Sequence, residues 1–130
     1  MIPGCVHASG FCKRLPMDPE VPAGLEGSYE IVGKDPASGA AFVGTLVLDR
    51  GETVYALTRT IADGTINGDA WFESCGADDI RTLMVRYDAM PAIEMACTLA
   101  ADGGNYYRIT CRTRQAGRRW QGLEAWFQKQ

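Results

Sequence analysis

The feature that most constrains this chain is a regular alternation of short β-type segments with turn residues. From Leu25 onward, runs rich in Val, Ile, Thr, Tyr and Phe alternate with Gly, Asp and Asn turns about every 10–14 residues. This spacing is typical of antiparallel sandwiches and barrels, because each run is long enough for one strand and each turn is short enough for a hairpin. The pattern predicts eight strands, over Leu25–Lys34, Ala41–Asp49, Thr53–Ile61, Ile66–Ser74, Arg81–Tyr87, Ala92–Ala100, Tyr106–Arg114 and Arg118–Gln128.

In an open sheet of eight strands joined by short hairpins, the two edge strands keep unpaired backbone N–H and C=O groups. Closure into a barrel pairs these two edges with each other. Several glycines lie inside the expected strands, where they permit the sharp bends of a small barrel. These are Gly27, Gly33, Gly44, Gly68 and Gly122. We therefore expect an all-β fold, an eight-stranded antiparallel up-and-down barrel over residues 25–130.

Residues 1–24 differ in texture from the rest of the 130-residue chain. They carry four of the six prolines and show no sustained period, which predicts an irregular tail or a strap across the barrel. The single histidine, His7, lies in this tail, where we expect it to be solvent-exposed and to have no catalytic role. One domain preceded by a tail is the organisation that this length supports.

Charge and hydropathy exclude several classes of function. Residues 1–107 carry a net charge of −8 and residues 108–130 a net charge of +5, which leaves −3 overall. We interpret the arginines near the C-terminus as a solvated outer strand face and expect no nucleic-acid partner, because nucleic-acid-binding domains are usually basic overall. No apolar run is long enough to span a membrane. The first ten residues lack the basic start and apolar stretch of a signal peptide, which favours a cytoplasmic location.

Five cysteines without a C-x-x-C motif argue against a zinc ribbon or a thioredoxin-like site, and we expect neither a metal nor a cofactor. A hairpin centred on Gly103-Gly104-Asn105 would place Cys97 directly opposite Cys111, each on the apolar face of its strand. That distance permits a disulfide. With a cytoplasmic location in view, we expect two free, buried thiols.

Arg59 is the most informative candidate site residue. It lies among Tyr55, Leu57 and Ile61 on the apolar face of its strand, so it must be paired or bound to something. Glu124 is the partner that could project into the same interior. The pair either fixes the register of the strands or anchors the carboxylate or phosphate of a ligand.

Four tyrosines share the expected inward faces, namely Tyr29, Tyr55, Tyr87 and Tyr107. Each phenol needs a hydrogen-bond partner in the interior, so four of them are compatible with an aromatic ligand pocket as well as with a filled core. An eight-stranded barrel is just wide enough for side chains or for one small ligand.

Several short motifs resemble those of calycin-type barrels, the lipocalins, avidins and fatty-acid-binding proteins, and most closely those of small bacterial single-domain barrels. They are Gly27-Ser28-Tyr29, Gly33-Lys34-Asp35-Pro36, Phe42-Val43-Gly44, Gly51-Glu52-Thr53-Val54-Tyr55 and Gly122-Leu123-Glu124, and the resemblance covers about residues 25–128. Lipocalins carry Trp where this chain has Tyr29. The resemblance implies a barrel that encloses a ligand, and it says more about the fold than about activity.

Three functions therefore compete. The first is binding of a small, partly apolar or amphipathic ligand inside the barrel, with Arg59, Glu124 and the four tyrosines as ligand-binding residues. The second is an isomerase or cyclase that uses the barrel as a template, for which Glu124 is the one plausible base. The third is an interaction or inhibitor module with a filled core, acting through its surface. Strands that are apolar on both faces also leave room for a homodimer, because a second subunit could cover the outer wall.

Overall fold

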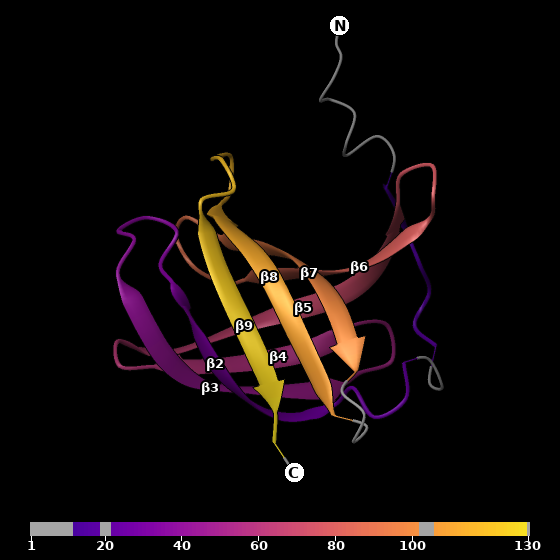
Figure 1. The fold of residues 1–130 in the computed structure, drawn as a ribbon, viewed down its shortest axis with the longest axis horizontal. Coiled ribbons are helices and arrows are strands. Elements are labelled where there is room, and N and C mark those ends of the chain that lie inside the picture. The colour runs from indigo at the N-terminus through magenta and orange to yellow at the C-terminus, as the bar shows by residue number, and fades with distance from the viewer. Residues whose placement is uncertain (1–11, 19–21, 102–105, 130) are drawn as a thin grey trace, which may run out of the picture.

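The computed structural model describes residues 12–18, 22–101 and 106–129, and within these residues the chain is entirely β, with nine antiparallel strands (Figure 1). No helix in this part of the chain is long and apolar enough to cross a membrane. The strands are β1 (Cys12–Arg14), β2 (Gly27–Lys34), β3 (Ala41–Arg50), β4 (Tyr55–Ile61), β5 (Gly64–Cys75), β6 (Ile80–Tyr87), β7 (Ile93–Ala101), β8 (Tyr107–Gln115) and β9 (Gly122–Gln128).

Eight of these strands form the predicted closed antiparallel barrel. Neighbours in sequence pair from β2 to β9, and β2 also pairs with β9, where Ile31 lies opposite Trp126. The long strand β5 helps to close the circle, since its first part pairs with β4 and its second part with β6. The two pairings overlap from Gly68 to Ala70, and an added Cβ at Gly68 would lie 2.7 Å from Cδ1 of Tyr87. Glycine is therefore required where β5 and β6 approach each other so closely.

The ninth strand, β1, was not among the predicted strands. It pairs with the end of β5, and a disulfide between Cys12 and Cys75 fastens it there. The amide of Leu15 then donates to the carbonyl of Phe72, so the contact continues past the strand. We call residues 12–18, the described part of the tail, the strap. His7 lies outside the described residues.

Inward and outward faces follow the alternation that the sequence predicted. The core consists of side chains that project inward from every strand of the barrel. Its largest members, which are at most 1% exposed, are Trp126, Tyr29, Tyr55, Tyr87, Leu25, Ile31, Leu46, Leu48, Leu57, Leu83, Met95 and Ile109. Alternation does not distinguish the two faces of the fourth and eighth predicted strands. The structure buries Ala70 and Phe72 of the fourth strand and Glu124 and Trp126 of the eighth.

One strand boundary differs clearly from the prediction. The last strand begins at Gly122 and not at Arg118. The segment before it is a loop, because Gly117 has a φ of 82° and the amide of Arg118 donates to the carbonyl of Gln115. The amide of Gln121 donates to the carbonyl of Thr113, and this leads the chain into β9.

The predicted register of the hairpin between β7 and β8 is confirmed. Cys97 lies directly opposite Cys111, and Leu99 lies opposite Ile109. The prediction of two free thiols is wrong, because the two cysteines form a disulfide, with their Cα atoms 4.0 Å apart and no exposed surface. We expected free thiols because of the cytoplasmic location, although the strand geometry permitted a disulfide. The loop residues Gly103-Gly104-Asn105 lie outside the described residues.

Candidate functional site

Arg59 and Glu124, which we call the polar centre, lie toward one of the two ends of the barrel. This end, called the Arg59 end below, is formed by residues 35–40, 62–63, 88–92 and 116–121, which connect the strands. Half-buried apolar side chains surround it on the inward face, namely Phe42, Ile61, Ile66 and Ile93. The other end is closed by fully buried residues, among them Leu25 and Leu48. A ligand would therefore meet the polar centre most directly from the Arg59 end.

Arg59 and Glu124 form the predicted pair. Nη2 of Arg59 donates to Oε1 of Glu124 at 3.0 Å, and the two side chains are 8% and 1% exposed. The guanidinium lies between two aromatic rings, with Cζ 4.7 Å from the ring centre of Phe42 and 5.7 Å from that of Tyr87. These contacts hold a charge in the interior by a salt bridge and by cation–π attraction.

Glu124 connects the pair to the aromatic core. Its second carboxylate oxygen, Oε2, accepts a hydrogen bond from Nε1 of Trp126 at 2.8 Å. Trp126 in turn packs edge-on against Tyr29, with ring centres 6.0 Å apart, and the Tyr29 hydroxyl donates to the carbonyl of Leu25. Each carboxylate oxygen therefore accepts one hydrogen bond, and these two bonds fix the orientation of Glu124 toward Arg59 and Trp126.

Two donor groups in this centre remain without a hydrogen-bond partner among the described residues. They are Nε of Arg59 and the hydroxyl of Tyr87, and both atoms are buried. The hydroxyl of Thr113, on β8 beside Gly122, is in the same position. The Tyr55 hydroxyl, at the other end, is also buried without a partner among the described residues. Buried polar groups are normally satisfied, so the three groups near Arg59 call for an explanation.

Burial sets the ionisation of the centre. Desolvation raises the pKa of Glu124, although Arg59 and Trp126 act in the opposite direction. The pKa of Tyr87 is raised, first by burial and then by the nearby negative charge of Glu124. Tyr87 therefore stays a neutral phenol that can donate a hydrogen bond to an acceptor.

The predicted tyrosines do not all share one environment. Tyr29, Tyr55 and Tyr87 are fully buried, as expected. Tyr107 is only half-buried, at the end opposite Arg59, and its hydroxyl donates to the carbonyl of Ala23. The structure thus places Tyr87 beside Arg59 and Glu124, and it places Tyr107 at the seam with the tail.

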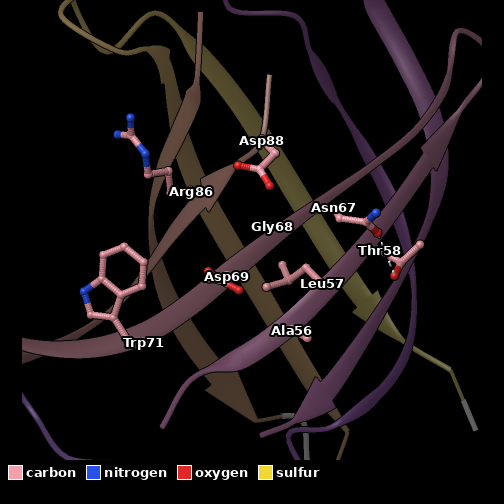
Figure 2. A pocket seen from close by; sticks show the side chains of 9 residues that line it. All are labelled: Ala56, Leu57, Thr58, Asn67, Gly68, Asp69, Trp71, Arg86 and Asp88. Carbon is pink, nitrogen blue, oxygen red and sulfur yellow. Dashed lines mark hydrogen bonds between the residues drawn. The ribbon is translucent and has the colours of Figure 1, made fainter. Parts of the chain in front are cut away.

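A second candidate site lies on the outside of the barrel (Figure 2). It is a hollow of about 280 Å³ on the wall formed by β4, β5 and β6. Its lining residues are Ala56, Leu57, Thr58, Asn67, Gly68, Asp69, Trp71, Arg86 and Asp88. Its polar groups include two carboxylates, and the indole of Trp71 borders it.

Trp71 is held in place at the border of this outer hollow. Its Nε1 donates to Glu73 at 2.7 Å, and the guanidinium of Arg14 lies 5.0 Å from the ring centre. Arg86 forms an ion pair with Glu94 at 2.6 Å, which partly compensates its positive charge. Asp69 and Asp88 are exposed. The sequence analysis did not find this hollow, although Asp69 and Trp71 share one face of their strand and could have indicated it.

One group of side chains in the described part of the chain has the composition of a metal site, namely Cys12, Glu73 and Cys75. The two sulfur atoms are joined in the disulfide that fastens β1, so they are not available as thiolate ligands. This group therefore acts as a covalent link between the strap and the barrel.

Comparison of the chain with models of protein families, with curated proteins and with solved structures finds no match. We therefore infer a function from the fold and from the contacts of the site.

Proposed function

We propose that this protein is a calycin-like barrel that binds a small, partly apolar ligand at the Arg59 end of its interior. The observation that carries the proposal is a pair of buried donors with no hydrogen-bond partner in the described part of the chain, Nε of Arg59 and the Tyr87 hydroxyl. A ligand oxygen, from a carboxylate or a carbonyl group, would accept from both. The half-buried ring of Phe42, Ile61, Ile66 and Ile93 would contact its apolar part.

Binding fits this centre better than catalysis does. An isomerase or cyclase built on the barrel would use Glu124 as its base, but both oxygens of Glu124 already accept hydrogen bonds from Arg59 and Trp126, which favours a positioning role. Arg59 keeps further donors beyond the one that it gives to Glu124. Glu124 is thus a positioning residue for Arg59, which would contact the ligand.

Native mass spectrometry of the purified full chain tests this proposal first. We expect a species heavier than the 14.1 kDa chain, and organic extraction should return it to the chain mass. The extracted protein is then titrated with anilinonaphthalene sulfonate, an apolar probe with an anionic group. The double variant Arg59→Met/Glu124→Leu should bind this probe at least about tenfold more weakly, because it removes the anchor without leaving an unpaired charge.

The matched control is Arg50→Met/Glu26→Leu, which removes an ion pair of similar length, 2.9 Å, from a partly exposed place at the other end of the barrel. It should leave probe binding unchanged. Equal binding by wild-type protein and both double variants, together with a bare chain mass, would exclude the interior as a ligand site.

The outer hollow favours a second candidate function, a module that acts through its surface. Two exposed carboxylates beside a fixed indole suit a small organic cation, since Asp69 and Asp88 attract the charge and Trp71 offers a ring face. Tetramethylammonium should change the tryptophan fluorescence of wild-type protein and have a smaller effect on Asp88→Asn. Asp49→Asn, an exposed position on β3, serves as the control. An equal response from all three proteins would eliminate this candidate.

A further inference from the structure

The outer wall of the barrel carries an apolar face across β3, β2 and β9. Val43, Val32, Leu123 and Phe127 are 71%, 42%, 57% and 43% exposed there, around the half-buried Ala125. We call these five residues the valine face. Large apolar side chains that gather on one wall mark an interaction surface. In the described residues the strap does not cover this wall, because β1 pairs with β5.

The register of the three strands gives the valine face a regular layout. Val32 lies opposite Val43 on one side and opposite Ala125 on the other, so these three residues form one row across the strands. On one side of the row Glu30 lies opposite Phe127, and on the other side Lys34 lies opposite Leu123. Glu30 and Lys34 are both exposed and each is two residues from Val32.

We propose that the valine face is the interface of a homodimer in which two copies pack about a two-fold axis along the Val43–Val32–Ala125 row. Rotation by 180° about this axis places the Glu30 side of the row in one copy against the Lys34 side of the row in the second copy. Each residue of the row then faces its own equivalent. Glu30 of each copy faces Lys34 of the second copy, and Phe127 faces Leu123 of the second copy.

Charge is the argument for a second copy as the occupant. The two charges that flank Val32 have opposite signs and stand at equal distances from the axis, so the face is complementary to itself. The larger apolar residues on β9 are arranged in the same way, with Phe127 and Leu123 two residues from Ala125. This proposal is independent of the ligand proposal, because the face points outward and the Arg59 centre points inward.

Sedimentation velocity of the full chain, from low to high micromolar concentration, tests the interface together with three charge variants. Wild-type protein should reach about twice the 14.1 kDa chain mass. Glu30→Lys alone and Lys34→Glu alone each place like charges opposite one another twice, and should weaken the dimer about tenfold. The double variant Glu30→Lys/Lys34→Glu exchanges the charges and should restore the wild-type dissociation constant.

Glu52→Lys is the matched control, because it reverses one exposed charge in the connection between β3 and β4 and should leave the dimer intact. Val32→Asp places two carboxylates face to face on the axis and should give a monomer with an unchanged circular dichroism spectrum. A wild-type protein that is monomeric at every concentration overturns the proposal. A dimer that withstands Val32→Asp, or that the double charge exchange does not restore, also overturns it, because its interface then lies elsewhere.

Discussion

Arg59 and Glu124 are 65 residues apart in the sequence, and their side chains meet in the interior of the barrel at 3.0 Å. This contact depends on closure of the sheet. The strands β4 and β9 are not neighbours, and their inward side chains reach the same interior only because the sheet curves into a barrel. Taking two charges out of water is costly, and an apolar pair of the same size would often be at least as stable. The pair therefore has a reason to exist other than stability, and ligand binding is the reason that we propose.

Arg59→Met should strongly destabilise the protein, because it leaves the carboxyl group of Glu124 buried without its partner. We expect the free energy of unfolding in urea to fall by about 3–5 kcal/mol. The double variant Arg59→Met/Glu124→Leu should recover most of this loss. Arg50→Met removes the partner of Glu26 from an ion pair whose side chains are 24% and 42% exposed, and it should cost less, about 1 kcal/mol. An equal cost for the two arginine variants would mean that Arg59 is not buried in solution.

The pairing of Arg59 with Glu124 could be predicted because both residues interrupt an apolar face with period two. On the same basis the sequence predicted the eight strands, the inward faces of six of them and the opposition of Cys97 and Cys111. Alternation determines which side chains share a face, and short hairpins determine which strands are neighbours.

What the sequence could not predict depends on contacts between distant segments. β1 has three residues, too few to show a period, and it exists because β5 extends beyond β4 and offers an unpaired edge. The outer hollow depends on how β5 passes from β4 to β6. The hydrogen-bond partners of the two Glu124 oxygens likewise depend on side-chain packing, which a pattern of apolar residues does not encode.

The two disulfides should differ in their accessibility to reductant. Cys12 and Cys75 are half-buried at the outer wall, whereas Cys97 and Cys111 have no exposed surface. Under mild reduction of the native protein, alkylation and peptide mapping should therefore label Cys12 and Cys75 first. Labelling of Cys97 and Cys111 should need a denaturant. The reverse order would show that the β7–β8 hairpin opens more readily than the strap.

The strap should also stabilise the barrel, because its disulfide links residues 63 positions apart and so restricts the unfolded chain. Cys12→Ser/Cys75→Ser should lower the free energy of unfolding by about 2–4 kcal/mol, as measured in guanidinium chloride. The circular dichroism spectrum should stay that of an all-β protein, since the barrel closes through β5 and β6 without β1. Loss of the β spectrum in this variant would mean that the barrel needs the strap to fold.

Gly33→Ala should disturb the candidate site through the ring of Phe42. An added Cβ at Gly33 would lie 2.6 Å from the carbonyl oxygen of Leu123 and 2.9 Å from Cζ of Phe42. The strands and the ring would have to shift, and the ring contacts the guanidinium of Arg59. We expect a loss of about 1–3 kcal/mol in urea unfolding together with weaker binding of the anionic probe. Ser28→Ala, on the exposed face of the same strand, should change neither quantity.

High pH should unfold the barrel through its buried phenols. Desolvation raises the pKa values of Tyr29, Tyr55 and Tyr87 above their ordinary value of 10.0, so the folded protein keeps these protons at a pH where the unfolded chain releases them. The unfolded state then binds fewer protons than the native state, and stability must fall as the pH rises above about 10. The phenolate absorbance of these residues should therefore appear in one step that coincides with loss of the β-type circular dichroism signal. A gradual phenolate titration of all the tyrosines while that signal persists would show that the interior admits water and hydroxide, and the buried Tyr87 hydroxyl would then have a solvent partner in place of a ligand.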